Sequence, residues 1–133
     1  MDNATRYLPF IGRLLIGAIF IASGIGKVSQ QASITAAIAH AGLPLAPLGY
    51  FVALAVEIGF GLLLILGWQT RVVAFVLAGW CIVTALFFHS NFSDQNMMIH
   101  FLKNVMIAAG LLQIVHFGSG SISLDTRAAG ASG

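Results

Sequence analysis

A single glutamate in the middle of a long apolar segment most constrains how this chain can fold. Residues 47–66 read PLGYFVALAVEIGFGLLLIL, and Glu57 carries the one charge among them. As a helix this segment is long enough to cross a bilayer, with Glu57 about 15 Å from either end and close to the midplane. A carboxylate there costs roughly 2.5–3.5 kcal/mol on insertion scales, so it must be protonated, paired or exposed to a wet cavity. Ala53 and Gly61, one turn away on either side, let another helix approach closely, which predicts that Glu57 points into a bundle.

The composition of the chain excludes a soluble globular domain. Hydrophobic residues make up 59% of the 133 positions and charged residues only 8%, whereas charged residues account for about 25% of a typical soluble domain. The sequence therefore predicts a single-domain integral membrane protein whose first partner is the lipid bilayer. The few cations form no basic patch, so a nucleic-acid partner is not expected. The single cysteine, Cys81, allows no internal disulfide and no CxxC redox pair, and we find no metal, flavin or haem motif.

Apolar segments of membrane-spanning length occur four times, at about 8–27, 47–66, 72–88 and 98–117. Their short connections predict an all-α, up-down-up-down four-helix bundle over residues 1–118, with both termini on the same side. The polar segment 29–46 is too polar to span and predicts a short interfacial helix between the first two spans. Residues 119–133 are small and polar, which predicts a mostly disordered tail.

The distribution of cations indicates an orientation for this bundle. Arg6, Arg13, Arg71 and Arg127 fall on the side of the termini, whereas Lys27 and Lys103 fall on the other side. Because cytoplasmic segments carry the excess of Lys and Arg, both termini of this multi-pass protein are expected in the cytoplasm.

Two cations compete to be the partner of Glu57 on this topology. Arg13 lies within the first apolar segment, on a helical stripe with Gly17, Phe20, Gly24 and Lys27, and Lys103 lies in the fourth. We favour Arg13, because a guanidinium pairs with a carboxylate through two hydrogen bonds and keeps its charge when buried. The pair is then either a structural lock on helix order or part of a functional site in which Glu57 accepts a proton.

Donor-rich side chains gather at the opposite end of the predicted bundle. His89, His100, Lys103 and Asn104 lie there beside several phenylalanines, an arrangement that suits the carbonyl oxygens of a quinone or an anionic substrate. The alternative is that these side chains only extend to the membrane surface. His89, Asp94 and His100 match no standard ligand spacing, so no metal site is expected.

The ordered set of these segments resembles the DoxX family of small four-helix membrane proteins. The resemblance covers about residues 13–125 and lies in R-LLIGAIFIASGIGK, E-IGFGLLLILGWQTR, His89 after the third span, LKN at 102–104 and the terminal SLD at 123–125. It implies a bacterial inner-membrane location and, by analogy with some relatives, a place in thiosulfate:quinone oxidoreductase or another membrane redox complex. Other relatives in the wider superfamily resemble cargo receptors or assembly chaperones. The matched residues are a charged set expected to form structural ion pairs, Arg13, Lys27, Glu57 and Arg71, and the ligand-binding candidates His89, Lys103 and Asn104.

Three functions follow from these observations and stay open at this point. The first is a quinone-interacting or accessory subunit of a membrane redox complex, with Glu57 as proton acceptor and His89, Lys103 and Asn104 as donors to a quinone. If it is catalytic, it acts as an oxidoreductase subunit together with a partner. The second is a non-catalytic scaffold, chaperone or assembly protein. The third is a proton-coupled small-molecule transporter, which requires a homo-oligomer because four helices cannot enclose a pathway alone.

Overall fold

The computed structural model describes residues 3–132, and within this range all regular elements are helical. The first long helix is α1 (Asn3–Val28), and the short helix α2 (Gln31–His40) follows it. One continuous rod is then formed by α3 (Ala46–Leu54), the π-helical segment η1 (Ala55–Phe60) and α4 (Gly61–Leu66). Two long helices, α5 (Thr70–Phe88) and α6 (Gln95–Phe117), come next, and α7 (Leu124–Ser132) ends the described chain.

The four predicted spans are confirmed as helices long and apolar enough to cross a membrane. They extend over Ala4–Val28, Ala46–Leu66, Thr70–Phe88 and Gln95–Phe117, so each predicted span is correct to within a few residues. Gly67 ends the second span in the left-handed conformation, with φ of +74°, and its N–H bonds the carbonyls of Leu63 and Leu64. The short helix expected between the first two spans is present as α2; its position at a membrane surface stays a prediction.

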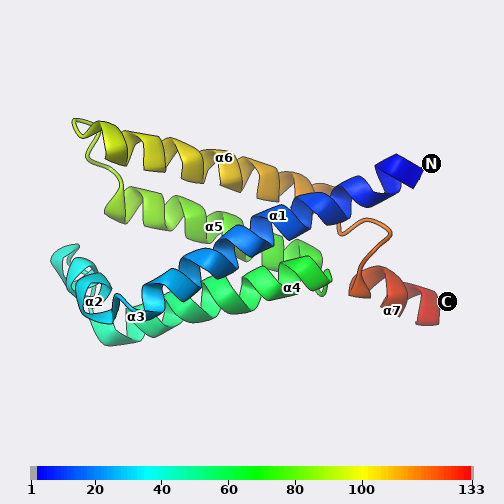
Figure 1. Ribbon diagram of the computed structural model, residues 1–133, viewed down its shortest axis with the longest axis horizontal. Coiled ribbons are helices and arrows are strands. Elements are labelled where there is room, and N and C mark those ends of the chain that lie inside the picture. The colour runs from blue at the N-terminus through cyan, green and yellow to red at the C-terminus, as the bar shows by residue number, and fades with distance from the viewer. Residues whose placement is uncertain (1–2, 133) are drawn as a thin grey trace.

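The helices are arranged as two packed pairs. α1 packs along η1 and α4, whereas α5 packs along α6, and α5 joins the pairs through its contacts with α4 and η1. Figure 1 shows both chain ends at one end of the bundle, here called the terminal end, and α2 with the α5–α6 loop at the other, here called the loop end. The buried core that connects the pairs includes Leu64, Ala74, Leu77 and Leu111, none of which is exposed.

Glycines on the predicted stripe of α1 allow the first two spans to touch. A Cβ atom added at Gly17 would lie 2.6 Å from the carbonyl oxygen of Gly61, and one at Gly24 would lie 2.5 Å from the side chain of Ile58. Lipid supplies no hydrophobic force between helices, so close packing of small residues is what holds such helices together. This contact fixes the height of α1 along η1 and α4, and therefore the residues that face Glu57.

Replacing Gly17 by alanine is expected to destabilise the folded protein by about 1–3 kcal/mol, because the new methyl group overlaps the backbone of α4. Gly12→Ala is the matched control, since nothing lies within 4 Å of a Cβ atom there. The control is expected to be neutral, or more stable by up to about 1 kcal/mol, because alanine favours helix over glycine. Thermal unfolding in detergent measures both variants; equal melting temperatures would show that α1 and α4 can separate at no cost.

The polar tail differs from its prediction, because residues 119–125 are folded against the bundle and residues 124–132 form the helix α7 instead of being disordered. Ser119 and Ser123 are buried and bonded to each other through their hydroxyl oxygens at 2.8 Å. Asp125 accepts hydrogen bonds from the N–H groups of Gln69 and Thr70 at 2.7 and 2.8 Å, and its own N–H bonds the carbonyl of Gly67. The tail thus caps the start of α5 and the end of α4.

The carboxylate of Asp125 suits this role. Burial alone would raise its pKa, but the hydrogen bonds from Thr70 and Gln69 and the charge of Arg13 outweigh burial and hold the pKa below its usual value. Asp125 therefore remains ionised through the neutral pH range. It places a negative charge at the N-terminus of α5, where the helix dipole favours it.

Candidate functional site

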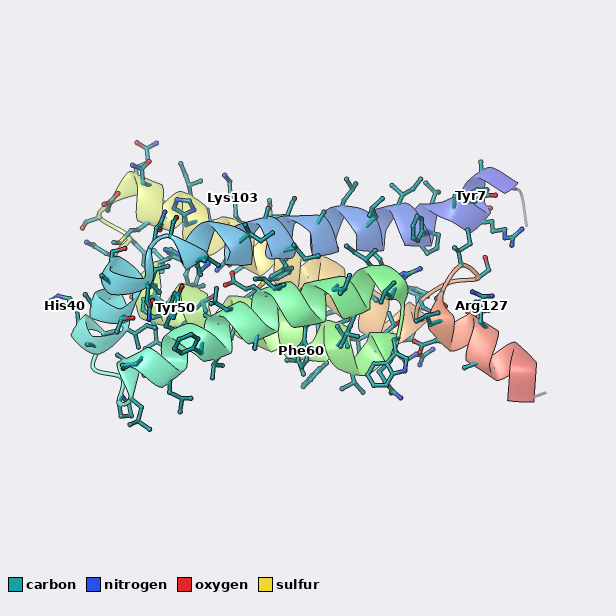
Figure 2. All side chains as sticks on the ribbon, turned by 60° about the horizontal axis from the view of Figure 1, so that its bottom comes forward. Tyr7, His40, Tyr50, Phe60, Lys103 and Arg127 are labelled. Atoms are coloured by element: carbon teal, nitrogen blue, oxygen red, sulfur yellow. The ribbon has the colours of Figure 1, made fainter. Side chains whose placement is uncertain are left out.

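A cavity of about 890 Å³ lies between the two helix pairs, toward the loop end. Its wall is formed by residues of α1, α2, α3, η1, α5 and α6, and we call it the central cavity. It contains all four ligand-binding and proton-accepting candidates of the sequence, Glu57, His89, Lys103 and Asn104. In Figure 2, Lys103 lies nearer to the end that carries His40 and Tyr50 than to the end that carries Tyr7 and Arg127. The structure therefore brings residues from η1, α5 and α6 into one site.

Glu57 is held at this cavity by two residues of α1. The carboxylate is 5% exposed, and its Oε1 accepts hydrogen bonds from Lys27 Nζ at 2.9 Å and from Ser23 Oγ at 2.8 Å. Lys27 Nζ also donates to Ser23 Oγ at 2.9 Å, so the three side chains form a closed cluster. The other carboxylate oxygen, Oε2, is buried and accepts no hydrogen bond from the described residues. One oxygen of a costly buried carboxylate thus lacks a partner among the described residues.

The predicted pair of Arg13 with Glu57 is wrong, since Lys27 takes that place. The reason is the direction of helical side chains, which lean toward the N-terminus of their own helix. Because α1 and the rod of η1 and α4 run in opposite directions in Figure 1, Lys27 and Glu57 lean toward each other. Arg13 also leans toward the terminal end, as Lys27 does, but it lies nearer that end on α1 and therefore points away from Glu57.

Arg13 instead joins the end of α4 to the tail. Its guanidinium is 1% exposed and donates to the carbonyl oxygens of Leu64 and Ile65 at 3.0 and 2.9 Å, and to that of Ile122. Carbonyls in the last turn of a helix lack partners within the helix, and the negative end of the dipole favours a cation there. The arginine is therefore structural.

Arg71 forms no ion pair among residues 3–132 either. It lies at the start of α5 and lines a shallow polar depression at the terminal end, beside Gly118 and Asp125. Of the four residues expected to form structural ion pairs, the described part of the chain pairs only Lys27 with Glu57.

The turn that carries Glu57 is π-helical rather than α-helical. Segment η1 inserts a wider turn into the second span at Ala55–Phe60. π-helical segments are rare overall, but those that occur are often found at functional sites, because the extra residue changes the direction in which a side chain points. Neither hydropathy nor helical periodicity in the sequence signals it.

His89 and His100 come together in the wall of the cavity. Their ring centroids are 5.3 Å apart and the planes are tilted by 33°. Burial, reinforced by the charges of His100 and Lys27, lowers the pKa of His89 below its ordinary value. The His89 ring is therefore neutral near physiological pH, with one N–H donor and one acceptor nitrogen.

Lys103 and Asn104 differ in their availability. Lys103 lines the cavity, is exposed, and forms no ion pair with any of residues 3–132. The amide group of Asn104 donates to the carbonyl of Cys81 at 3.2 Å and to Thr84 Oγ1 at 3.3 Å, which ties α6 to α5. Both amide hydrogens of Asn104 are thus used inside the protein, and only its carbonyl oxygen can face a ligand.

Sequence reasoning missed Ser23 as a part of the site, and although it placed Lys27 in the structural ion-pair set, it named Arg13 and not Lys27 as the partner of Glu57. A signal was present, because Ser23 and Lys27 are four residues apart and share one face of the first helix. What the sequence does not contain is the height of the helices relative to each other. Tyr50 Oη donates to the carbonyls of Lys27 and Val28 at 3.0 and 3.3 Å, so the end of α1 lies level with Tyr50 and α3 begins beyond it.

Comparison with known proteins supports the resemblance that the sequence indicated. Residues 8–90 match the DoxX family. The chain is 33% identical to the inner membrane protein YqjF of Escherichia coli K12 over 117 residues, covering 86% of this chain and 87% of that protein. It is 30% identical to the inner membrane protein YphA of the same organism over 139 aligned positions, covering 94% of this chain and 99% of that protein. No solved structure matches significantly. The chain belongs to the DoxX family.

Proposed function

We propose that this inner-membrane protein of DoxX type binds a membrane quinone in the central cavity and acts with a redox partner. The observation that carries the proposal is the unpartnered Oε2 of Glu57 in a cavity that also contains Lys103 and His89. A quinone head group needs hydrogen-bond donors for its carbonyl oxygens, and its reduced form needs an acceptor for a hydroxyl. The cavity offers both kinds of group.

The donors for a carbonyl oxygen are Lys103 and His89. The ammonium group of Lys103 lies at the cavity wall outside any ion pair with residues 3–132, and the neutral ring of His89 keeps one N–H. Asn104 has a different role from the one predicted, because its amide hydrogens already bond Cys81 and Thr84. It supports the wall, and its carbonyl oxygen adds an acceptor.

Glu57 is the group that exchanges a proton with the ligand. When bound, a quinone supplies two-electron chemistry in which its carbonyl oxygens gain or lose protons. Lys27 and Ser23 hold Oε1 through hydrogen bonds, which leaves Oε2 to accept the hydroxyl proton of a quinol. Glu57 Oε2 takes one of the two protons that a quinol releases on oxidation, the acceptor nitrogen of the neutral His89 ring takes the other, and the two electrons pass to the redox partner. Lys27, rather than Arg13, is then the cation that tunes the charge of Glu57.

The test is the amount of quinone that copurifies with the protein in mild detergent. About one quinone per chain is expected in the wild type and less than about a tenth of that in a His89→Ala, Lys103→Met double variant, since a loss of 1.4 kcal/mol is tenfold in affinity. His40→Ala is the matched control, because His40 lies on α2 outside the cavity wall. Wild-type protein that takes up no quinone, even when quinone is added, would contradict the proposal and favour a scaffold.

A further inference from the structure

The central cavity has a polar half and an apolar half, and three helices agree on which is which. Along α1 the wall changes from Leu15, Ile16, Ile19 and Phe20 to Ser23 and Lys27. Along α5 it changes from Trp80 and Cys81 to Thr84 and Phe88, and His89 follows at the end of the helix. Along α6 it changes from Ile107 to Asn104, Lys103 and His100. On these three helices the polar residues lie toward the loop end, where α2 and Leu43 add mostly apolar side chains to the wall. A ligand that fits this wall is an amphiphile with its head at the loop end.

The apolar half opens through the side of the bundle. Leu15 and Ile19 line the cavity although they are 60% and 64% exposed, so the cavity reaches the outer surface of α1 there. The gap lies between α1 and α6, because α1 packs along η1 and α4 while α6 packs along α5. Both residues lie within the first membrane span, where the surroundings are lipid. The opening therefore faces the hydrocarbon core and not water.

The length of this apolar half suits a chain rather than a ring. From Lys27 back to Leu15 the wall follows α1 for about 18 Å at 1.5 Å per residue. A quinone head placed beside Lys103 and Glu57 fills only the polar part of that distance. The rest of the wall is apolar on α1, α5 and α6.

We infer that the isoprenoid tail of the quinone lies along the apolar half of the cavity and leaves it between α1 and α6, at Leu15 and Ile19. This inference rests on the proposed function and names the ligand class more narrowly, as a quinone with a long tail that enters sideways from the bilayer. Because the isoprenoid tail is already surrounded by lipid, its transfer into the cavity adds little hydrophobic free energy to binding. The opening therefore selects ligands by their shape, and a side chain that blocks it excludes the isoprenoid tail.

The test compares two quinones with the same head group, one with a decyl tail and one with a methyl group in its place. Binding to detergent-purified protein is measured by calorimetry in the wild type, in Ile19→Trp and in Ile25→Trp. Ile25 is the matched control, because it is 59% exposed on α1 but does not line the cavity. Ile19→Trp is expected to weaken the decyl quinone about tenfold or more and to leave the short quinone within about twofold. Ile25→Trp is expected to change neither.

The outcomes separate the two proposals. Equal binding of the decyl quinone by Ile19→Trp and by the wild type would overturn the lateral opening while the head-group site remains. Loss of both quinones in a folded Ile19→Trp variant would also overturn it, because a block of the tail alone spares the short ligand. Failure of the wild type to bind either quinone would instead reject the quinone site itself.

Discussion

Replacing Lys27 by methionine is expected to lower the free energy of unfolding by about 3 kcal/mol, the lower end of the range for breaking a buried ion pair. Methionine keeps the apolar stem of the side chain but leaves the Glu57 carboxylate with Ser23 as its one remaining donor. The variant must therefore keep an unpaired charge within the membrane span or take up a proton, and both cost free energy. The lower end of the range applies because the Lys27 side chain is 28% exposed, against 7% for Glu57.

Two further variants test whether this loss comes from the ion pair. Lys103→Met removes the same type of side chain from the same cavity, but from a residue that pairs with no carboxylate of residues 3–132, and is expected to change stability by less than about 0.5 kcal/mol. Adding Glu57→Gln to Lys27→Met removes the stranded charge and is expected to restore at least half of the loss. Thermal unfolding of the three proteins in one detergent gives the comparison. A Lys27→Met protein as stable as Lys103→Met would show that the pair contributes nothing to folding.

The membrane spans were predictable because their signal is local. Hydropathy and length fix where a helix can cross a bilayer. Gly67 marks a helix end because glycine readily adopts the left-handed conformation found there. The sequence also singles out the polar residues of the central cavity, although it pairs Glu57 with Arg13 and places His89 and Lys103 in a separate cluster. Glu57, His89 and Lys103 are polar groups at the edges or in the middle of apolar segments, where they are costly unless they meet.

The partner of Glu57 was not predictable from the same kind of signal. Counting residues from the span ends assumes that neighbouring helices end at one height, whereas α3 begins beyond the end of α1 at Tyr50. Because of that offset and of the direction in which each side chain leans, Lys27 rather than Arg13 is the ion-pair partner of Glu57. The π-helical turn at Ala55–Phe60 is equally silent in the sequence, since neither hydropathy nor helical periodicity signals it.

The tail failed as a prediction because composition measures what a segment can bury by itself. Residues 119–125 are too small and polar to form a core, yet their groups meet partners supplied by distant parts of the chain. Asp125 finds two free N–H groups at the start of α5, and the carbonyl of Ile122 finds a buried arginine. Each of these contacts joins residues more than fifty positions apart, and no local pattern records them.

Arg13→Met is expected to destabilise the protein by about 2–3 kcal/mol, because it leaves partly buried carbonyl groups without a donor, at the lower part of the range of roughly 1–3 kcal/mol for each buried group. The loss falls chiefly on Ile65 and Ile122, since the carbonyl of Leu64 also accepts from Gly67 N–H at 3.2 Å. Arg13→Lys keeps the charge but not the planar fork of donors that reaches both α4 and the tail. It is expected to recover about half of the loss at most.

Hydrogen exchange shows where the Arg13 variant loosens, and this distinguishes a latch from a general loss of stability. Arg13 joins α4 to Ile122. In Arg13→Met, the increase in exchange rate over the wild type is therefore expected to be larger for the amides of residues 122–127 than for those of α5 and α6. Arg6→Met provides the control, as Arg6 lies on the same helix but is exposed. Protection that falls equally in all helices would mean that Arg13 supports the whole bundle. Protection of residues 122–127 unchanged from the wild type would show that the tail is held by Asp125 and its neighbours without the arginine.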